Sequence, residues 1–157
     1  MSSLIWAVLF VAATLLMVAL VPRQQVAEFL QFGLVGGLGV ALLILVVFVP
    51  FLEFWRFAPP DLLTIEGIPL FMAMAAIPLS MIFARSLTKG EGLLPFLVVL
   101  GFPLAATFIH YMLIINGNLA YRNWSLAKTF LLALVTHAAL AAYILANFRR
   151  KIGIKED

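Results

Sequence analysis

Two histidines and a few hydroxyl groups are the side chains that could do chemistry inside the long apolar segments of this sequence. The imidazoles are His110 and His137, and an imidazole can transfer protons, bind a metal or hydrogen-bond to a neighbour. The hydroxyls belong to Thr14, Ser80, Thr107 and Thr136. No Asp, Glu, Lys or Arg lies near the middle of these segments. Because ion-coupled transporters and intramembrane enzymes usually need such groups, the sequence argues against both classes.

The positions of the histidines predict neither a metal nor a haem site. His110 lies about seven residues before the end of its apolar segment, roughly 10 Å along a helix, whereas His137 lies near the middle of the next one. Different depths make a shared metal or a bis-histidine haem unfavourable. The chain also has no Cys, which removes thiolate metal sites and disulfides. We therefore expect no metal and no cofactor, and neutral hydrogen bonds for each imidazole.

Most other polar groups fall in two loops that we expect on the outer face of the membrane. One loop follows the second apolar segment, and the other joins the fourth segment to the fifth. Acids, amides and aromatic rings at such an interface could bind a polar ligand or a lipid headgroup, or could form an ordinary solvated rim. The candidate binding residues are His110, Tyr111, Glu66, Asn116, Tyr121 and Trp124.

The elements that position these residues are predicted to be five transmembrane helices. The chain has 157 residues, of which 65% are hydrophobic and 11% charged, whereas soluble domains have about 45–50% and about 25%. Charge-free stretches of about 20 residues match the thickness of a bilayer. The sequence thus predicts an all-α membrane protein with one domain over residues 1–157. Its spans are expected near 4–21, 29–50, 65–83, 93–115 and 126–146.

The distribution of Lys and Arg predicts the orientation. Seven of the ten fall in the first and third loops and the C-terminal tail, and three fall on the opposite side. The positive-inside rule places the N-terminus outside and the C-terminus in the cytoplasm, in a multi-pass protein of the cytoplasmic membrane. The basic tail at Arg149, Arg150 and Lys151 indicates contact with anionic lipids. Membrane lipids, other membrane subunits or a second copy are the expected partners, and nucleic acid is not.

Small residues and turn signals suggest how the helices are arranged. Gly33 and Gly37 are spaced for close helix contact, as are Ala138 and Ala142, either within one chain or in a homodimer. Short connections predict that the first and second helices are antiparallel neighbours, and likewise the third and fourth. Asp61 or Thr64 is the expected N-cap of the third helix, with Glu66 near its positive end.

One segment of the second half resembles a known pattern. Gly117, Tyr121, Trp124 and Ser125 follow the order G-x-x-x-Y-x-x-W-s. This resembles a segment of a small, uncharacterised multi-pass membrane family common in spore-forming bacteria, and the Gly67-Ile-Pro69 helix opening is similar too. Many members carry an acid where this chain has His110, so no residue role transfers. The resemblance implies a membrane topology and no particular reaction, substrate or cofactor.

Three functions remain open on the sequence. The first is a non-catalytic membrane protein that acts as an accessory or scaffold subunit or as a lipid-interacting module. The second is a small-molecule carrier or substrate-binding component, with a cavity lined by His110, Ser80 and Thr107. The third is an intramembrane enzyme acting on a lipid or isoprenoid, with Glu66 or His110 as acid or base.

Overall fold

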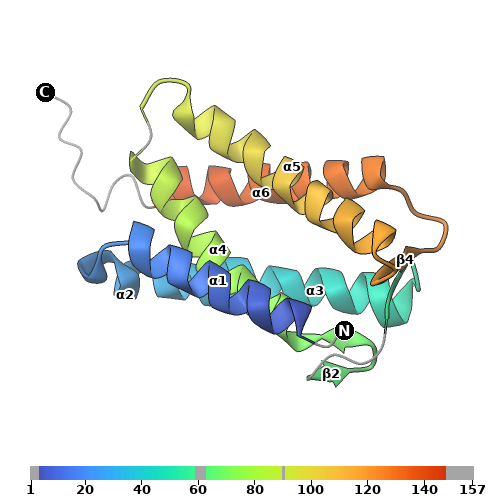
Figure 1. Cartoon of the computed structure of the whole chain (residues 1–157). Helices are drawn as coiled ribbons and strands as arrows, with labels where there is room; N and C mark the ends of the chain where they lie inside the picture. Colours follow the sequence, from blue (N-terminus) through green and yellow to red (C-terminus); the bar gives the residue numbers. More distant parts are fainter. Residues whose placement is uncertain (1–3, 59–62, 90, 148–157) are drawn as a thin grey trace, which may run out of the picture.

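The chain folds into helices that run back and forth between two ends of the molecule (Figure 1). This computed structural model describes residues 4–58, 63–89 and 91–147. The helices are α1 (Ile5–Leu20), α2 (Arg23–Phe32), η1 (Gly33–Gly39), α3 (Val40–Val46), η2 (Val47–Phe51), α4 (Leu70–Lys89), α5 (Leu94–Ile115) and α6 (Leu126–Asn147). Four short strands join them, namely β1 (Trp55–Phe57), β2 (Thr64–Ile65), β3 (Ile68–Pro69) and β4 (Leu119–Tyr121).

Four helical runs are long and apolar enough to cross a membrane. They are Arg23–Phe51, Leu70–Lys89, Leu94–Ile115 and Leu126–Asn147. The first run joins α2, η1, α3 and η2 into one continuous helix, which we call the second helix. The remaining helix, α1, is apolar but shorter, with 16 residues. The predicted helical membrane-type fold is confirmed to this extent.

The second helix begins earlier than its apolar stretch. We predicted a span from residue 29, but the helix starts at Arg23, directly after Pro22. Proline is well placed at a helix start because its missing N–H is not needed there, and the following Gln, Ala and Glu residues favour helix. Arg85 on α4 donates a hydrogen bond to Gln25 in this added segment. The charge-free stretch of the sequence therefore predicted the apolar part of this helix but not its first turns.

The helix α4, which corresponds to the third predicted span, begins later than predicted because a β-hairpin precedes it. β2 and β3 pair antiparallel across Glu66 and Gly67, both of which have positive φ (49° and 80°). Two such residues form the turn that suits a two-residue hairpin. The expected N-cap role of Thr64 is therefore wrong, and Glu66 lies exposed in a turn rather than in the first helical turn. The alternative N-cap, Asp61, and the basic tail lie outside the described residues.

The central element of the bundle is α4, which contacts α1, the second helix, α5 and α6. The first and second helices were expected to pack on each other, but each packs mainly on α4. A short connection holds only the joined ends together, so it does not decide which faces meet. Gly33 and Gly37 lie against α4, where a Cβ on Gly37 would come 2.5 Å from the carbonyl oxygen of Ala76. The alanines of the other small-residue pair, Ala138 and Ala142, are exposed on α6.

A small cap closes one end of the bundle. Here β1 pairs antiparallel with β4, so that Trp55 faces Tyr121 across the ladder. Glu53 accepts hydrogen bonds from Arg56 at 3.0 Å and from Arg122 at 2.9 Å, and all three side chains are more than half exposed. The ladder joins the two loops that the sequence placed on one face, and brings them over α5 and α6. We call β1, β4 and Trp124 the cap.

Candidate ligand-binding cavity

A cavity of about 420 Å³ lies inside the helical bundle, beneath the cap. Residues of α1, α3, α4, α5 and α6 line it, together with Trp55 of the cap. Many of the lining residues are alanines, which leave room because their side chains are short, and most of the others are aliphatic. The volume falls within the range of small-molecule sites, which are typically mostly apolar with few polar groups. We call this space the central cavity.

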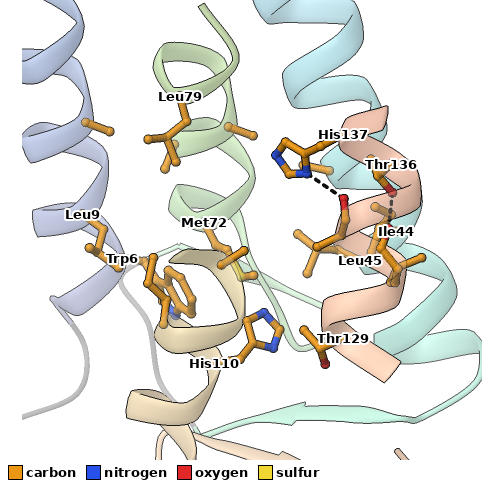
Figure 2. A pocket seen from close by; sticks show the side chains of 18 of the residues that line it. Trp6, Leu9, Ile44, Leu45, Met72, Leu79, His110, Thr129, Thr136 and His137 are labelled. Carbon is orange, nitrogen blue, oxygen red and sulfur yellow. Dashed lines mark hydrogen bonds between the residues drawn. The ribbon is translucent and has the colours of Figure 1, made fainter. Parts of the chain in front are cut away.

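Four polar side chains line the central cavity along one wall (Figure 2). They are His110 on α5 and Thr129, Thr136 and His137 on α6. The ring of His110 points from α5 toward Thr129, and that of His137 extends from α6 toward α4. No Asp, Glu, Lys or Arg is among the described residues that line the cavity. The wall therefore offers hydrogen bonds in an apolar space, without a formal charge.

A chain of hydrogen bonds connects His110 to the cap. Its Nδ1 lies 2.7 Å from the Tyr121 hydroxyl, which lies 2.6 Å from the Thr129 hydroxyl. The indole N–H of Trp124 also donates to the Thr129 oxygen, at 2.9 Å. Burial raises the pKa of Tyr121 above its usual value, with the hydrogen bond to Thr129 acting in the opposite direction. Tyr121 is therefore a neutral phenol at physiological pH and can both donate and accept.

The direction of this chain decides what His110 offers to the cavity. If Thr129 donates to the carbonyl of Ser125, 3.2 Å away, Tyr121 donates to Thr129 and accepts from Nδ1–H of His110. The Nε2 atom is then a bare acceptor. If Thr129 donates to Tyr121 instead, Tyr121 donates to Nδ1, and Nε2 carries the proton. His110 can thus present either an acceptor or a donor without changing its position.

Aromatic rings hold His110 and the cap in place. The indole of Trp55 lies edge-on to the His110 ring, with centroids 4.9 Å apart. Phe48 packs on both Trp55 and Trp124 at 4.9 and 4.8 Å. The buried indole nitrogen of Trp55 has no hydrogen-bond partner within the described part of the chain. Such packing fixes the imidazole in a buried environment, where a hydrogen bond is stronger than in water.

His137 has a different set of contacts in the interior of the bundle. Its Nδ1 lies 2.7 Å from the carbonyl oxygen of Ala133, one turn earlier on α6. Its ring packs against Phe83 at 5.1 Å and Phe102 at 5.8 Å. His110 lies level with Thr129, to which Tyr121 links it. Thr129 precedes His137 by eight residues on α6, so the two imidazoles differ in depth by about 12 Å. The expected difference in depth therefore holds, yet both rings line one cavity.

A second hollow adjoins the first at Thr136. It has a volume of about 840 Å³ and lies between α6 and the second helix. Thr136 lines both spaces. From there the hollow extends along α6 to Asn147, with Gln31 on the facing helix. We call it the side cavity, and its polar end lies at the end of the bundle opposite the cap.

Of the candidate binding residues predicted from the sequence, the structure brings His110, Tyr121 and Trp124 together and leaves the others apart. Tyr111 is exposed and packs on Phe108. Asn116 is exposed, and its amide donates to the carbonyl of Met112. Glu66 lies in the β2–β3 turn. These three side chains do not line the central cavity.

Sequence reasoning missed several residues of the cavity and assigned others to it in error. Ser80 and Thr107, expected beside His110, donate to carbonyls of their own helices, Ile77 and Pro103, and are not among the lining residues. Thr129 was missed, although its position four residues after Ser125, near the start of a helix, could have indicated an inward-facing hydroxyl. Trp6 was seen only as an interfacial aromatic residue, and it lines the cavity.

Comparison with known proteins adds no functional information. No protein family, no curated protein and no solved structure matches the chain. Within residues 4–58, 63–89 and 91–147, no group of three or more His, Asp and Glu side chains could hold a metal ion. The function must therefore be inferred from the cavity.

Proposed function

We propose that this protein is a lipid-interacting module of the cytoplasmic membrane that binds a lipophilic small molecule inside its helical bundle. The central cavity carries this proposal. It is lined mainly by apolar residues of five helices, it has the volume of a small-molecule site, and its few polar groups lie along one wall. A molecule dissolved in the bilayer is the natural ligand, since the apolar walls would not stabilise a charged one.

The proposal includes five membrane spans. Beyond the four long helices, α1 exposes Val8, Val11, Leu15 and Val18, an apolar surface that lipid would cover. Its opposite side packs on α4 and lines the cavity through Trp6. At 16 residues it is about 24 Å long, which is short for a span but sufficient with its flanking apolar residues.

The proposed orientation has the cap outside and the other end of the bundle in the cytoplasm. Arg56, Arg122 and Lys128 lie near the cap. Of the remaining seven Lys and Arg residues, Arg23, Arg85 and Lys89 lie at the opposite end of the bundle, and the other four follow α6 in the sequence. The bias follows the positive-inside rule, so the N-terminus is outside and the C-terminus is cytoplasmic.

Quenching of tryptophan fluorescence tests ligand binding. Trp6 and Trp55 both line the cavity, so bound 1-bromododecane should quench their emission in detergent-solubilised protein. Ala133→Leu, which fills part of the cavity, should reduce the saturable quenching. Ala138→Leu makes the same change at an exposed position five residues along α6 and is the matched control. If quenching is equal in the wild type and both variants, the bromoalkane contacts the protein only through the micelle, and the proposal fails.

A carrier is the second candidate function, because the side cavity suggests a route for the ligand. Thr136 lines both cavities, and the side cavity extends from there toward the opposite end of the bundle. A substitution that fills the side cavity, such as Ala139→Leu at an exposed lining position of α6, should slow exchange of bound bromoalkane if the route is used. An unchanged exchange rate would leave the binding module as the only supported role.

A further inference from the structure

We propose that the molecule bound in the central cavity is a lipophilic alcohol whose hydroxyl group donates a hydrogen bond to Nε2 of His137. This inference rests on the proposed binding function and names the chemical class of the ligand. It is carried by the hydrogen bonds and surroundings of the His137 ring. The alternatives that the experiment must distinguish are a plain hydrocarbon, an ether or ester, and a trapped water molecule.

The contact with Ala133 fixes the tautomer of His137. A carbonyl oxygen only accepts hydrogen bonds, so Nδ1, 2.7 Å away, must carry the proton. Protonation of both nitrogens would place a positive charge in an apolar space, and no Asp or Glu is found among the described lining residues to balance it. Nε2 of a neutral His137 is therefore a bare acceptor.

This acceptor has no partner in the described part of the protein. Ala133 is the one hydrogen-bond partner found for the ring, and Phe83 and Phe102 pack around it. The one fully buried side-chain nitrogen or oxygen without a partner among the described residues is the indole nitrogen of Trp55, so Nε2 of His137 keeps accessible surface that a bound molecule can reach. An acceptor left without a partner in an apolar space costs free energy. His137 is also the eleventh residue after Leu126, about 16 Å along α6 from its start, too deep for bulk water at the membrane surface.

The geometry restricts the chemical class of the partner. It must carry a hydrogen-bond donor, which excludes hydrocarbons, ethers, ketones and esters. It must also be neutral, because an ammonium group would bring an uncompensated charge into the cavity. A hydroxyl group meets both conditions, and the apolar chain that carries it can occupy the alanine-rich space of the central cavity.

Three probes of equal size but different polarity test the inference. They are 1-dodecanol, 1-methoxyundecane and tridecane, each competed against 1-bromododecane in the fluorescence assay, with affinity expressed per mole fraction in the micelle. The wild type should bind the alcohol about tenfold more tightly than the ether, the effect of one buried hydrogen bond. His137→Phe keeps an aromatic ring beside Phe83 and should bind alcohol and ether equally. His110→Phe tests the other imidazole that lines the cavity, and Tyr111→Phe, at an exposed residue that does not line it, is the control that should retain the preference.

The outcomes separate this inference from the proposed function. If all three probes compete equally in the wild type, the cavity binds apolar molecules but the hydroxyl contact is wrong, and a water molecule satisfies Nε2. If the preference survives in His137→Phe and is lost in His110→Phe, the inference is also overturned, because the other imidazole recognises the hydroxyl. If no probe competes, the binding function itself fails. Tridecane affinity near the wild-type value shows that the His137→Phe cavity is intact.

Discussion

The hydroxyl of Tyr121 lies 2.7 Å from Nδ1 of His110, and this contact ties the cap to α5, one of the long apolar helices. Tyr121 belongs to a three-residue strand that pairs with β1, whereas His110 belongs to α5. The same hydroxyl contacts Thr129 on α6. One phenol therefore links the cap, α5 and α6 at the edge of the central cavity.

Removing that hydroxyl should destabilise the protein. Tyr121→Phe deletes the bonds to His110 and Thr129 while keeping the ring, and should lower the free energy of unfolding by about 1–3 kcal/mol. Unfolding in mixed micelles monitored by circular dichroism would measure the change. Tyr111→Phe is the control, because Tyr111 is 46% exposed and has no hydrogen bond within the described residues. Equal losses in both variants would mean that the chain of hydrogen bonds does not stabilise the fold.

Close packing of the second helix on α4 leads to a second prediction. A Cβ at position 37 would come 2.5 Å from the carbonyl oxygen of Ala76, so Gly37→Ala forces the two backbones apart. We expect a loss of about 1–3 kcal/mol in unfolding free energy. Gly101→Ala is the matched control, since a Cβ there meets nothing within 4 Å, and it should leave stability unchanged or slightly higher. A stable Gly37→Ala protein would show that the contact with α4 is loose.

Much of the helical framework could be predicted from the sequence because apolar segments end where charges or turn residues begin. The last two helices were expected at 93–115 and 126–146 and are found at Leu94–Ile115 and Leu126–Asn147. The start of α4 could not be located in this way. Its hairpin depends on positive φ at Glu66 and Gly67, and Glu is an unusual residue for the first position of such a turn.

The cavity was predictable only in part, because its residues come from distant parts of the chain. Hydropathy indicates that Thr129 and Trp6 lie at segment ends, but not that they lie around one space with His110. That arrangement depends on α4 lying between the first and second helices, which short connections do not specify. The pairing of β1 with β4, which places Tyr121 over His110, is likewise a tertiary contact with no local signal.

The absence of cysteine allows a direct test of the proposed orientation. Single cysteines can be introduced at Asn116, near the cap, and at Glu91, between α4 and α5, which are both exposed. A membrane-impermeant maleimide should label Asn116→Cys in intact cells, and Glu91→Cys only after permeabilisation, because the proposed orientation places the cap outside. The cysteine-free wild type serves as the background control. The opposite labelling pattern would invert the proposed topology.

The buried phenol also predicts a dependence of stability on alkaline pH. Because burial raises the pKa of Tyr121 in the folded protein, the unfolded chain, with a tyrosine pKa near 10, loses that proton first as pH rises. Stability is therefore full below about pH 10 and falls as pH increases through the folded-state pKa. The Tm of the wild type should decrease more steeply between pH 9 and 11 than that of Tyr121→Phe, which keeps Tyr111 and Tyr143 and so controls for the other phenols. Parallel decreases in the two proteins would mean that Tyr121 is solvated and that its link to His110 is open to water.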